Sequence, residues 1–309
     1  MQDLSNVDAS NVDPSLTSYG YIPNRTVAYI FLVLFALSTV LHLGQGVWFR
    51  KWWVIPTIVL AGGLETAGWA GRLWSSYRPL ASDPYMLQIV CTILGPTPLL
   101  AANFIIFGEL ISIMGPIYSR LAPRLYSRVF LSCDIISLIV QGAGGGIAAS
   151  ADDHDGAELG GNIMLGGIIF QLVVIVVYTT LSAEFFWRYA TDHPVSSKLP
   201  GNARDSQSTL STHTMRGELS GRSRLMVGAL CFNLLVLFIR AIYRTIELSD
   251  GWNGRIITTE VYFNVLDGAM VVLAIYTFNI VHPGLLPTAK TAKPEDKEMN
   301  STPLMQSVV

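Results

Sequence analysis

Residues 225–248 read LMVGALCFNLLVLFIRAIYRTIEL, an apolar run of membrane-spanning length that carries three ionisable residues near its end. An ionised side chain at membrane depth costs about 2.5–3.5 kcal/mol on insertion scales, so such residues usually pair or line a cavity. At helical spacing, Arg240, Arg244 and Glu247 lie along one stripe of this helix. The partners that neutralise the two arginines are therefore expected on other helices.

The composition of the whole chain is that of a membrane protein. Of 309 residues, 51 % are hydrophobic and 14 % are charged, against about 25 % charged residues in soluble domains. We therefore predict an all-α membrane protein, a seven-transmembrane helix bundle within residues 24–285. The predicted spans are residues 27–49, 53–74, 86–114, 129–150, 161–187, 225–248 and 261–281.

The distribution of lysine and arginine predicts the orientation. Fourteen of the 20 fall in loops of one side, three in loops of the other, and three within helices. The amino terminus is thus expected outside and the carboxyl terminus in the cytoplasm. Residues 1–23, the cytoplasmic loop 188–224 and the tail 286–309 are polar and are expected to be disordered, and the loop is a candidate site for a cytoplasmic regulator.

Further polar residues recur inside the predicted spans. Glu65 and Arg72 share one face of the second span, and Asp134 and Gln141 share one face of the fourth. The sequence Gly-Pro-Thr-Pro at residues 95–98 interrupts the third span near its middle, where the freed carbonyls need partners. Such breaks often line the substrate path of transporters, although many only bend a helix.

The positions of the charges predict a site. Most of them fall in the outer half of the membrane when they are counted by helical rise, and they predict a hydrated, charge-balanced cavity that opens outward between the second, sixth and seventh spans. An ion-pair network that only fixes helix packing is the alternative interpretation. The candidate binding or translocation residues are Glu65, Arg72, Gln88, Asp134, Gln141, Gln171, Arg240, Tyr243, Arg244, Glu247, Glu260 and Asp267.

His42 is a separate candidate near the inner end of the first span. It is either a histidine hydrogen-bonded within the bundle or a contact for a proton or a lipid headgroup. No other histidine lies deep in a predicted span, which disfavours a three-histidine zinc site.

Several functional classes lack their motifs in this sequence. All five lysines lie outside the predicted spans and none follows a glycine, which excludes an intramembrane Schiff base and a Walker A loop. No Gly-x-Ser-x-Gly elbow is present. We therefore expect no enzyme, no metal, no cofactor, and neither a nucleotide nor a nucleic acid as partner.

In order and spacing, the polar residues resemble those of the fungal RTA-like family of seven-transmembrane lipid-translocating exporters. Phe104, Glu109, Trp69 and Thr259 depart from the residues usual in that family. The resemblance extends over about residues 21–283 and rests on Tyr21, Pro23, His42, Glu65, Gly68, Arg72, Tyr85, Gln88, Pro96, Ala101, Asp134, Gln141, Gly144, Gly145, Gly167, Gln171, Arg240, Tyr243, Arg244, Glu247, Gly251, Glu260 and Asp267.

The resemblance implies export or flipping of an amphiphile, such as a sphingoid long-chain base or a sterol-like toxicant, and thereby resistance to it. It favours the plasma membrane, with a vacuolar or endoplasmic reticulum membrane as the alternative. In the predicted cavity the carboxylates would accept a cationic or zwitterionic headgroup, and the arginines would organise them or contact a phosphate. The rival functions are a seven-helix lipid or stress sensor that signals through its cytoplasmic loop, and a metal-dependent hydrolase of the same topology.

Overall fold

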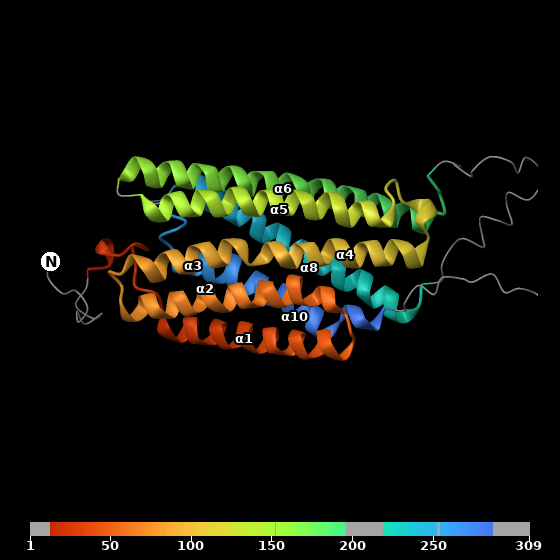
Figure 1. Ribbon diagram of the computed structural model, residues 1–309, viewed down its shortest axis with the longest axis horizontal. Helices are drawn as coiled ribbons and strands as arrows, with labels where there is room; N and C mark the ends of the chain where they lie inside the picture. The colour runs from red at the N-terminus through yellow and green to blue at the C-terminus, as the bar shows by residue number, and fades with distance from the viewer. Residues whose placement is uncertain (1–12, 152, 196–218, 252–253, 287–309) are drawn as a thin grey trace, which may run out of the picture.

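The computed structural model describes residues 13–151, 153–195, 219–251 and 254–286, and within these ranges the chain is helical and has no strand (Figure 1). Short 3-10 helices cover Pro14–Leu16, Trp52–Val54, Pro116–Tyr118 and Pro283–Leu285, and π-helical turns cover Ile55–Val59 and Asn264–Ala269. The α-helices are α1 (Arg25–Trp48), α2 (Leu60–Tyr77), α3 (Ser82–Leu94), α4 (Pro96–Met114), α5 (Pro123–Ser150), α6 (His154–Thr191), α8 (Gly221–Ser249), α9 (Glu260–Phe263) and α10 (Met270–Ile280).

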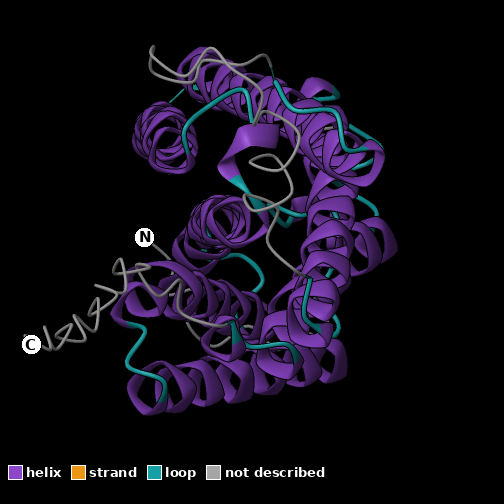
Figure 2. Cartoon of the chain, turned by 90° about the vertical axis from the view of Figure 1, so that its right-hand side faces the viewer, coloured by secondary structure: helices purple, strands orange, loops and turns teal. Residues whose placement is uncertain are grey.

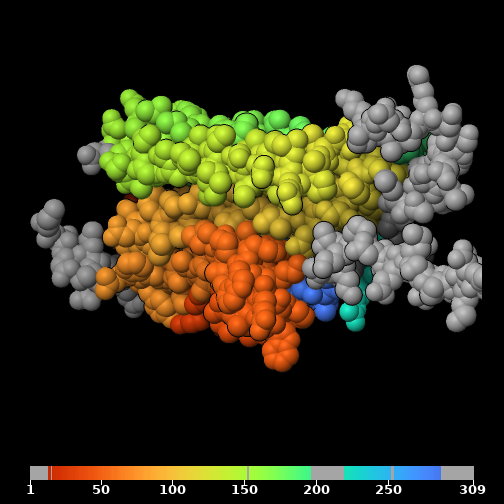
Figure 3. Space-filling model, turned by 45° about the vertical axis from the view of Figure 1, so that its right-hand side comes forward, coloured from red at the N-terminus to blue at the C-terminus, as the bar shows by residue number. Residues whose placement is uncertain are grey.

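The helices run along one common long axis. The hairpin of α5 and α6 forms one side, α1 lies at the opposite side, and α3, α4 and α8 lie between them (Figure 1). Figure 2 shows the same helices end-on. A belt of exposed aliphatic side chains covers the outer helices, as on α1 at Val33 and Val40, and Figure 3 shows the part of this surface formed by α5 and the α1–α2 hairpin. This belt is the surface expected to face lipid acyl chains.

Six helical segments of the described chain are long and apolar enough to cross a membrane: residues 25–48, 82–114, 123–150, 154–191, 221–249 and 260–285. The expected span at residues 53–74 is the one outside this set. It corresponds to the π-helical turn Ile55–Val59 and α2, which pack against α1, α3 and α4. The buried charges of Glu65 and Arg72, together with several glycines, make α2 less apolar than the other segments.

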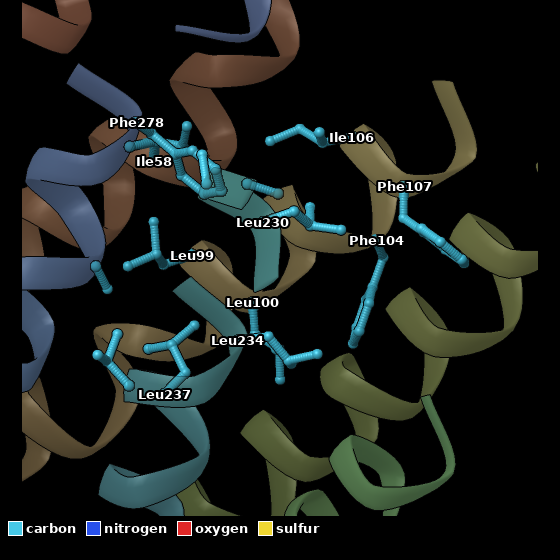
Figure 4. Close-up of a cluster of buried hydrophobic side chains, with 14 of the residues drawn as sticks. Ile58, Leu99, Leu100, Phe104, Ile106, Phe107, Leu230, Leu234, Leu237 and Phe278 are labelled. Carbon is cyan, nitrogen blue, oxygen red and sulfur yellow. The ribbon is translucent and has the colours of Figure 1, made fainter. Parts of the chain in front are cut away.

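The central rod of the bundle is formed by α3 and α4. In its most apolar stretch 78 % of the residues are buried, against 22–50 % in the other five segments. Gly95 keeps helical angles, φ −52° and ψ −50°, so the prolines interrupt the hydrogen bonds of the rod without breaking the chain direction. Leu100 of α4 lies beside Leu234 of α8, while Phe104 lies toward α5 (Figure 4).

The hairpin of α5 and α6 is held by close backbone contact. A Cβ atom placed on Gly144 would lie 2.6 Å from the Met164 nitrogen and 2.7 Å from the Gly160 oxygen, so only glycine fits at this crossing. Small residues let helix backbones approach closely, and the glycine-rich stretch at residues 142–146 provides them. Gly142 and Gly146, in contrast, would meet no atom of the described residues within 4 Å.

Several expected boundaries shift. The acidic stretch at residues 153–158, expected as a loop, mostly belongs to α6, because Asp153 caps this helix by accepting a hydrogen bond from the Gly156 nitrogen at 2.9 Å. Residues 13–23, placed in a disordered tail by composition, pack against the bundle through buried Tyr19 and half-buried Tyr21. The other expected disordered parts, at residues 1–12, 196–218 and 287–309, lie outside the described residues, and so does most of the candidate regulator loop.

Candidate functional site

The stripe of charges on α8 pairs with a single carboxylate on the last membrane segment. Arg244 binds Asp267 with two hydrogen bonds, Nε to Oδ1 at 2.9 Å and Nη2 to Oδ2 at 2.8 Å. Arg240 forms an ion pair with the same carboxylate, with Nε 2.8 Å from Oδ1. Asp267 is fully buried in the π-helical turn Asn264–Ala269, a kind of local distortion that is frequent at functional sites. The expectation that the arginines find their partner on another helix is confirmed.

Glu247 completes this group at the outer end of the stripe. Its Oε2 accepts from Arg244 Nη1 and its Oε1 from the Tyr243 hydroxyl, both at 2.7 Å. All of these side chains are buried. Arg240, Arg244, Glu247 and Asp267 are called the charge cluster below.

The proline break of the central rod supplies acceptors to the charge cluster. In an uninterrupted helix the Thr92 carbonyl would accept from the N–H of residue 96, but Pro96 has none. Arg240 Nη2 donates to this carbonyl instead. Arg244 Nη2 donates to the Thr92 hydroxyl at 2.9 Å, and the Gln88 amide lies 3.5 Å from the same hydroxyl. Thr92, next to the break, therefore accepts a hydrogen bond from each of the two buried arginines.

Thr92→Val is expected to lower the free energy of unfolding by about 1.5–3 kcal/mol, because it removes the acceptor of a buried, charged hydrogen bond while it keeps the shape of the side chain. Unfolding in mixed detergent micelles measures the effect. Thr180→Val is the matched control, since the exposed Thr180 hydroxyl bonds to the Val176 carbonyl of its own helix, and it should stay within about 0.5 kcal/mol. Equal stability of the two variants would contradict the role of Thr92.

A second group of charges lies near the carboxyl-terminal end of α2. Arg72 Nη2 donates to the Tyr21 hydroxyl at 2.9 Å and to Glu260 Oε1 at 3.1 Å. The guanidinium also lies over the rings of Phe263, at 4.6 Å, and Tyr19, at 5.4 Å. Burial raises the pKa of Tyr19 to about 12 and also raises the pKa of Tyr21, so both phenols stay neutral. Residues 13–23 thus cover the Arg72 side chain through Tyr19 and Tyr21.

Glu65 is a carboxyl that takes part in none of the hydrogen bonds and ion pairs described above. It is fully buried, and neither of its oxygens has a hydrogen-bond partner among the described residues. Oε1 lies against the proline break, because a Cβ atom on Gly95 would be 2.7 Å away from it. The indole nitrogen of Trp69, one turn further along α2, is likewise without a hydrogen-bond partner in this part of the chain. Such orphaned polar atoms inside a bundle commonly mark a water or ligand position.

Two of the three predicted glutamines, Gln141 and Gln171, form a separate group between α4, α5 and α6, called the amide cluster below. Gln141 Nε2 donates to Gln171 Oε1 at 3.1 Å and to the Ser137 hydroxyl at 2.6 Å. Gln171 Nε2 donates to the Thr97 hydroxyl at 3.0 Å. Asp134 lies on the same face of α5 and is buried, and neither of its carboxyl oxygens has a hydrogen-bond partner within the described ranges.

His42 lies on the side of the bundle formed by α1 and α10. Its Nε2 is 3.0 Å from the Ile275 carbonyl oxygen, and its ring centre is 6.2 Å from that of His282. It therefore joins two helices, as the packing interpretation predicts, and contacts neither the charge cluster nor the amide cluster.

Two narrow pockets lie among these residues, while the hydrated, outward-opening cavity expected between the second, sixth and seventh spans stays a prediction. One is lined by residues of the charge and amide clusters, including Gln141, Gln171 and Arg240, and the other by Arg72, Gln88 and residues around them. Each has an accessible volume of about 20 Å³, room for about one water molecule. A lipid headgroup can enter this region only if the helices around it part.

Most predicted site residues thus fall into three groups, which are the charge cluster, the pair of Arg72 and Glu260, and the amide cluster, while Glu65 lies against the proline break. Sequence reasoning missed Thr92, Thr97 and Tyr19 as parts of them. One signal was available for Thr92, since it stands four residues before a proline and its carbonyl must find another donor.

Comparisons with known proteins agree with this architecture. A family model described as "RTA1 like protein" matches residues 58–290. The sphingoid long-chain base transporter RSB1 of Saccharomyces cerevisiae is 28 % identical over 279 residues, which cover 86 % of this chain and 73 % of that protein. The lipid-translocating exporter-like protein RTA1 of Leptosphaeria maculans is 25 % identical over 289 residues, covering 86 % and 51 %.

A further relative bears a different name. The protoporphyrin uptake protein 1 of Saccharomyces cerevisiae is 23 % identical over 307 residues, covering 88 % of this chain and 93 % of that protein. No solved structure matches. Because the family model covers most of the helical region, the chain belongs to the RTA1-like family.

Proposed function

We propose that this protein moves an amphiphile with a cationic or zwitterionic headgroup, such as a sphingoid long-chain base, across the membrane and thereby contributes to resistance. The observation that carries the proposal is the buried carboxyl of Glu65, which lies at the break of the central rod without a hydrogen-bond partner among the described residues. The names of the relatives support it, since they refer to sphingoid bases, lipid translocation and protoporphyrin uptake. Movement of a small molecule is common to all three names.

The proposed architecture has seven crossings, with α2 as the seventh, the amino terminus outside and the carboxyl terminus in the cytoplasm. Two observations support α2 as a crossing. It packs along α1, which has spanning length, and along α3, which continues into α4 as one segment of spanning length, and its two charged residues are buried inside the protein. The excess of lysine and arginine on one side supports the orientation. The plasma membrane is the proposed location.

The geometry supports different roles for the carboxyls of the site. Asp267 and Glu247 are held by arginines, and Glu260 by Arg72, whereas Glu65 is available to a cationic headgroup or a proton. A headgroup that enters would draw further carboxylates away from their arginines, and the freed arginines could then contact a phosphate. The prolines of the central rod make it the element that yields most readily, because its hydrogen-bond ladder is already interrupted.

Glu65→Gln tests this proposal with little effect on the fold, because the carboxyl has no hydrogen bond to lose in the described structure and the amide has nearly the same shape. We expect the free energy of unfolding to stay within about 1 kcal/mol of the parent. The movement of a fluorescent sphingoid base should be at least tenfold slower, measured in proteoliposomes with and without a proton gradient. A tenfold change corresponds to about 1.4 kcal/mol.

Glu109→Gln is the matched control at the opposite end of the bundle. Glu109 is paired with Lys51 at 2.9 Å and its side chain is 31 % exposed, so its loss should cost below about 1 kcal/mol and leave movement unchanged. If the Glu65→Gln variant moved the sphingoid base as fast as the parent, Glu65 would not be part of the translocation site. Absence of movement in the parent protein, with folding confirmed, would reject transport itself.

A further inference from the structure

An apolar groove runs between α6 and α8 on the lipid-facing surface. Its volume is about 460 Å³, far larger than the polar pockets, and it is lined by aliphatic and aromatic side chains that include Val176 and Phe186 on α6 and Leu230, Leu234 and Phe238 on α8. From Val176 to Phe186 the groove extends over eleven residues of α6, and the rise between the first and the last is about 15 Å. This length equals one leaflet of a hydrocarbon core about 30 Å thick.

The groove adjoins the polar pocket along the same two helices. Val176 and Phe238 line the groove, while the adjacent Ile175 and Leu237 line the pocket, which continues to Gln171 on α6 and Arg240 on α8. An apolar channel of leaflet length thus leads to a polar end near the middle of the bundle. This arrangement matches a molecule with one hydrocarbon chain and a small headgroup.

The polar end offers acceptors that lack donors. Gln141 Oε1 is buried and has no hydrogen-bond partner among the residues described, and Gln141 lines the pocket. Asp134, seven residues earlier on the same face of α5, has two such oxygens, and Gln171 is the polar neighbour of its carboxyl. The two arginines that reach the pocket are already neutralised by Asp267 and Glu247. A headgroup that donates hydrogen bonds satisfies these acceptors, whereas a carboxylate does not.

We infer that the groove between α6 and α8 binds the hydrocarbon chain of a long-chain amino alcohol whose amine and hydroxyl groups reach Gln141 and the amide cluster. This inference rests on the proposed function and adds a binding site for the hydrocarbon chain to it. In this pose the chain lies in the half of α6 that ends near Arg120 and Arg188, and the headgroup lies near the middle of the bundle.

Photocrosslinking tests the site directly. The full-length purified protein, in lipid nanodiscs, receives a sphingosine that carries a diazirine near the end of its chain, and mass spectrometry locates the adducts. We expect adducts in residues 176–186 and 230–238 that excess unlabelled sphingosine removes. Stearic acid, with the same chain length and no amine, should compete at least tenfold less well because its carboxylate leaves the buried acceptors unsatisfied.

Two pairs of variants separate the chain site from the headgroup site. Ala183→Trp fills the groove and should reduce the competed adducts at least fivefold, whereas Val177→Trp, on the exposed side of α6 outside the groove, should leave them unchanged. Gln141→Met should abolish the preference for sphingosine over stearic acid and keep the chain in place. If Gln141→Met fails to fold, Gln171→Met gives the same readout from the neighbouring helix.

The results discriminate this inference from the proposed function. The groove would be rejected as the binding site if the adducts that unlabelled sphingosine removes lay on another face of the protein, or if sphingosine removed none of them. This holds even if the parent protein moved lipid in proteoliposomes. Competed adducts in the groove without any lipid movement would uphold the binding site and reject transport.

Discussion

Gly160→Leu is expected to force α5 and α6 apart and to lower the free energy of unfolding by about 3 kcal/mol or more. A Cβ atom at Gly160 would lie 2.6 Å from the Gly144 oxygen and would also meet the backbone nitrogen of Ala148. These are backbone atoms of the facing helix, which cannot rotate away as a side chain can. The hairpin holds the amide cluster together, so lipid movement should fall along with stability.

Gly166→Leu is the matched control on the same helix. A Cβ atom at Gly166 meets no atom of the described residues within 4 Å, and leucine at this lipid-facing position should change stability by below about 0.5 kcal/mol. Unfolding of both variants in mixed detergent micelles measures the difference. Equal losses would show that the helix, and not the crossing with α5, disfavours leucine.

The two glycines illustrate what can be predicted from sequence here. A run of glycines in the fourth predicted span permits close helix packing, and such packing occurs at Gly144. Which glycine of the run Gly142–Gly146 meets α6 depends on the rotation of each helix against its neighbour. That rotation follows from packing over the whole hairpin and not from local sequence.

The charged residues show the same difference between what the sequence predicts and what depends on the assembled structure. Their helical spacing predicts that Arg240, Arg244 and Glu247 share one face, and they do. Their partners depend on the π-helical turn around Asp267, where one extra residue per turn changes the direction of the side chain. Ordinary helical periodicity cannot anticipate such a turn.

The glutamines separated from the charges for a related reason. Gln141 and Gln171 were expected in one common site with the arginines, and they instead form their own cluster on the hairpin of α5 and α6 that touches the charge cluster at one pocket. Periodicity assigns residues to faces of single helices, whereas the order in which the helices surround one another is a property of the assembled bundle.

Asp267→Ala is expected to lower the free energy of unfolding by about 3–5 kcal/mol, because it leaves two buried guanidiniums without their shared carboxylate. Glu184→Ala is the control with the same connectivity. Glu184 also pairs with two arginines, Arg120 and Arg188, each at 2.7 Å, but near the end of the bundle, where such pairs contribute about 0–1 kcal/mol. Similar losses in both variants would show that burial does not set the strength of the Asp267 pairs.

The double variant Arg240→Met with Asp267→Asn decides whether these charges serve packing alone. In this double variant Arg244 keeps Glu247 as a partner, and the Arg240 charge, which would have no carboxylate partner, is removed. The free energy of unfolding should therefore be more than about 1 kcal/mol higher than that of the single variant Asp267→Asn. We expect movement of the fluorescent sphingoid base to stay at least tenfold below the parent, because the exchange of partners at the site needs the charges themselves. If movement recovered together with stability, the Arg240–Asp267 pair would be a packing element, and translocation would have to depend on Glu65 and the amide cluster.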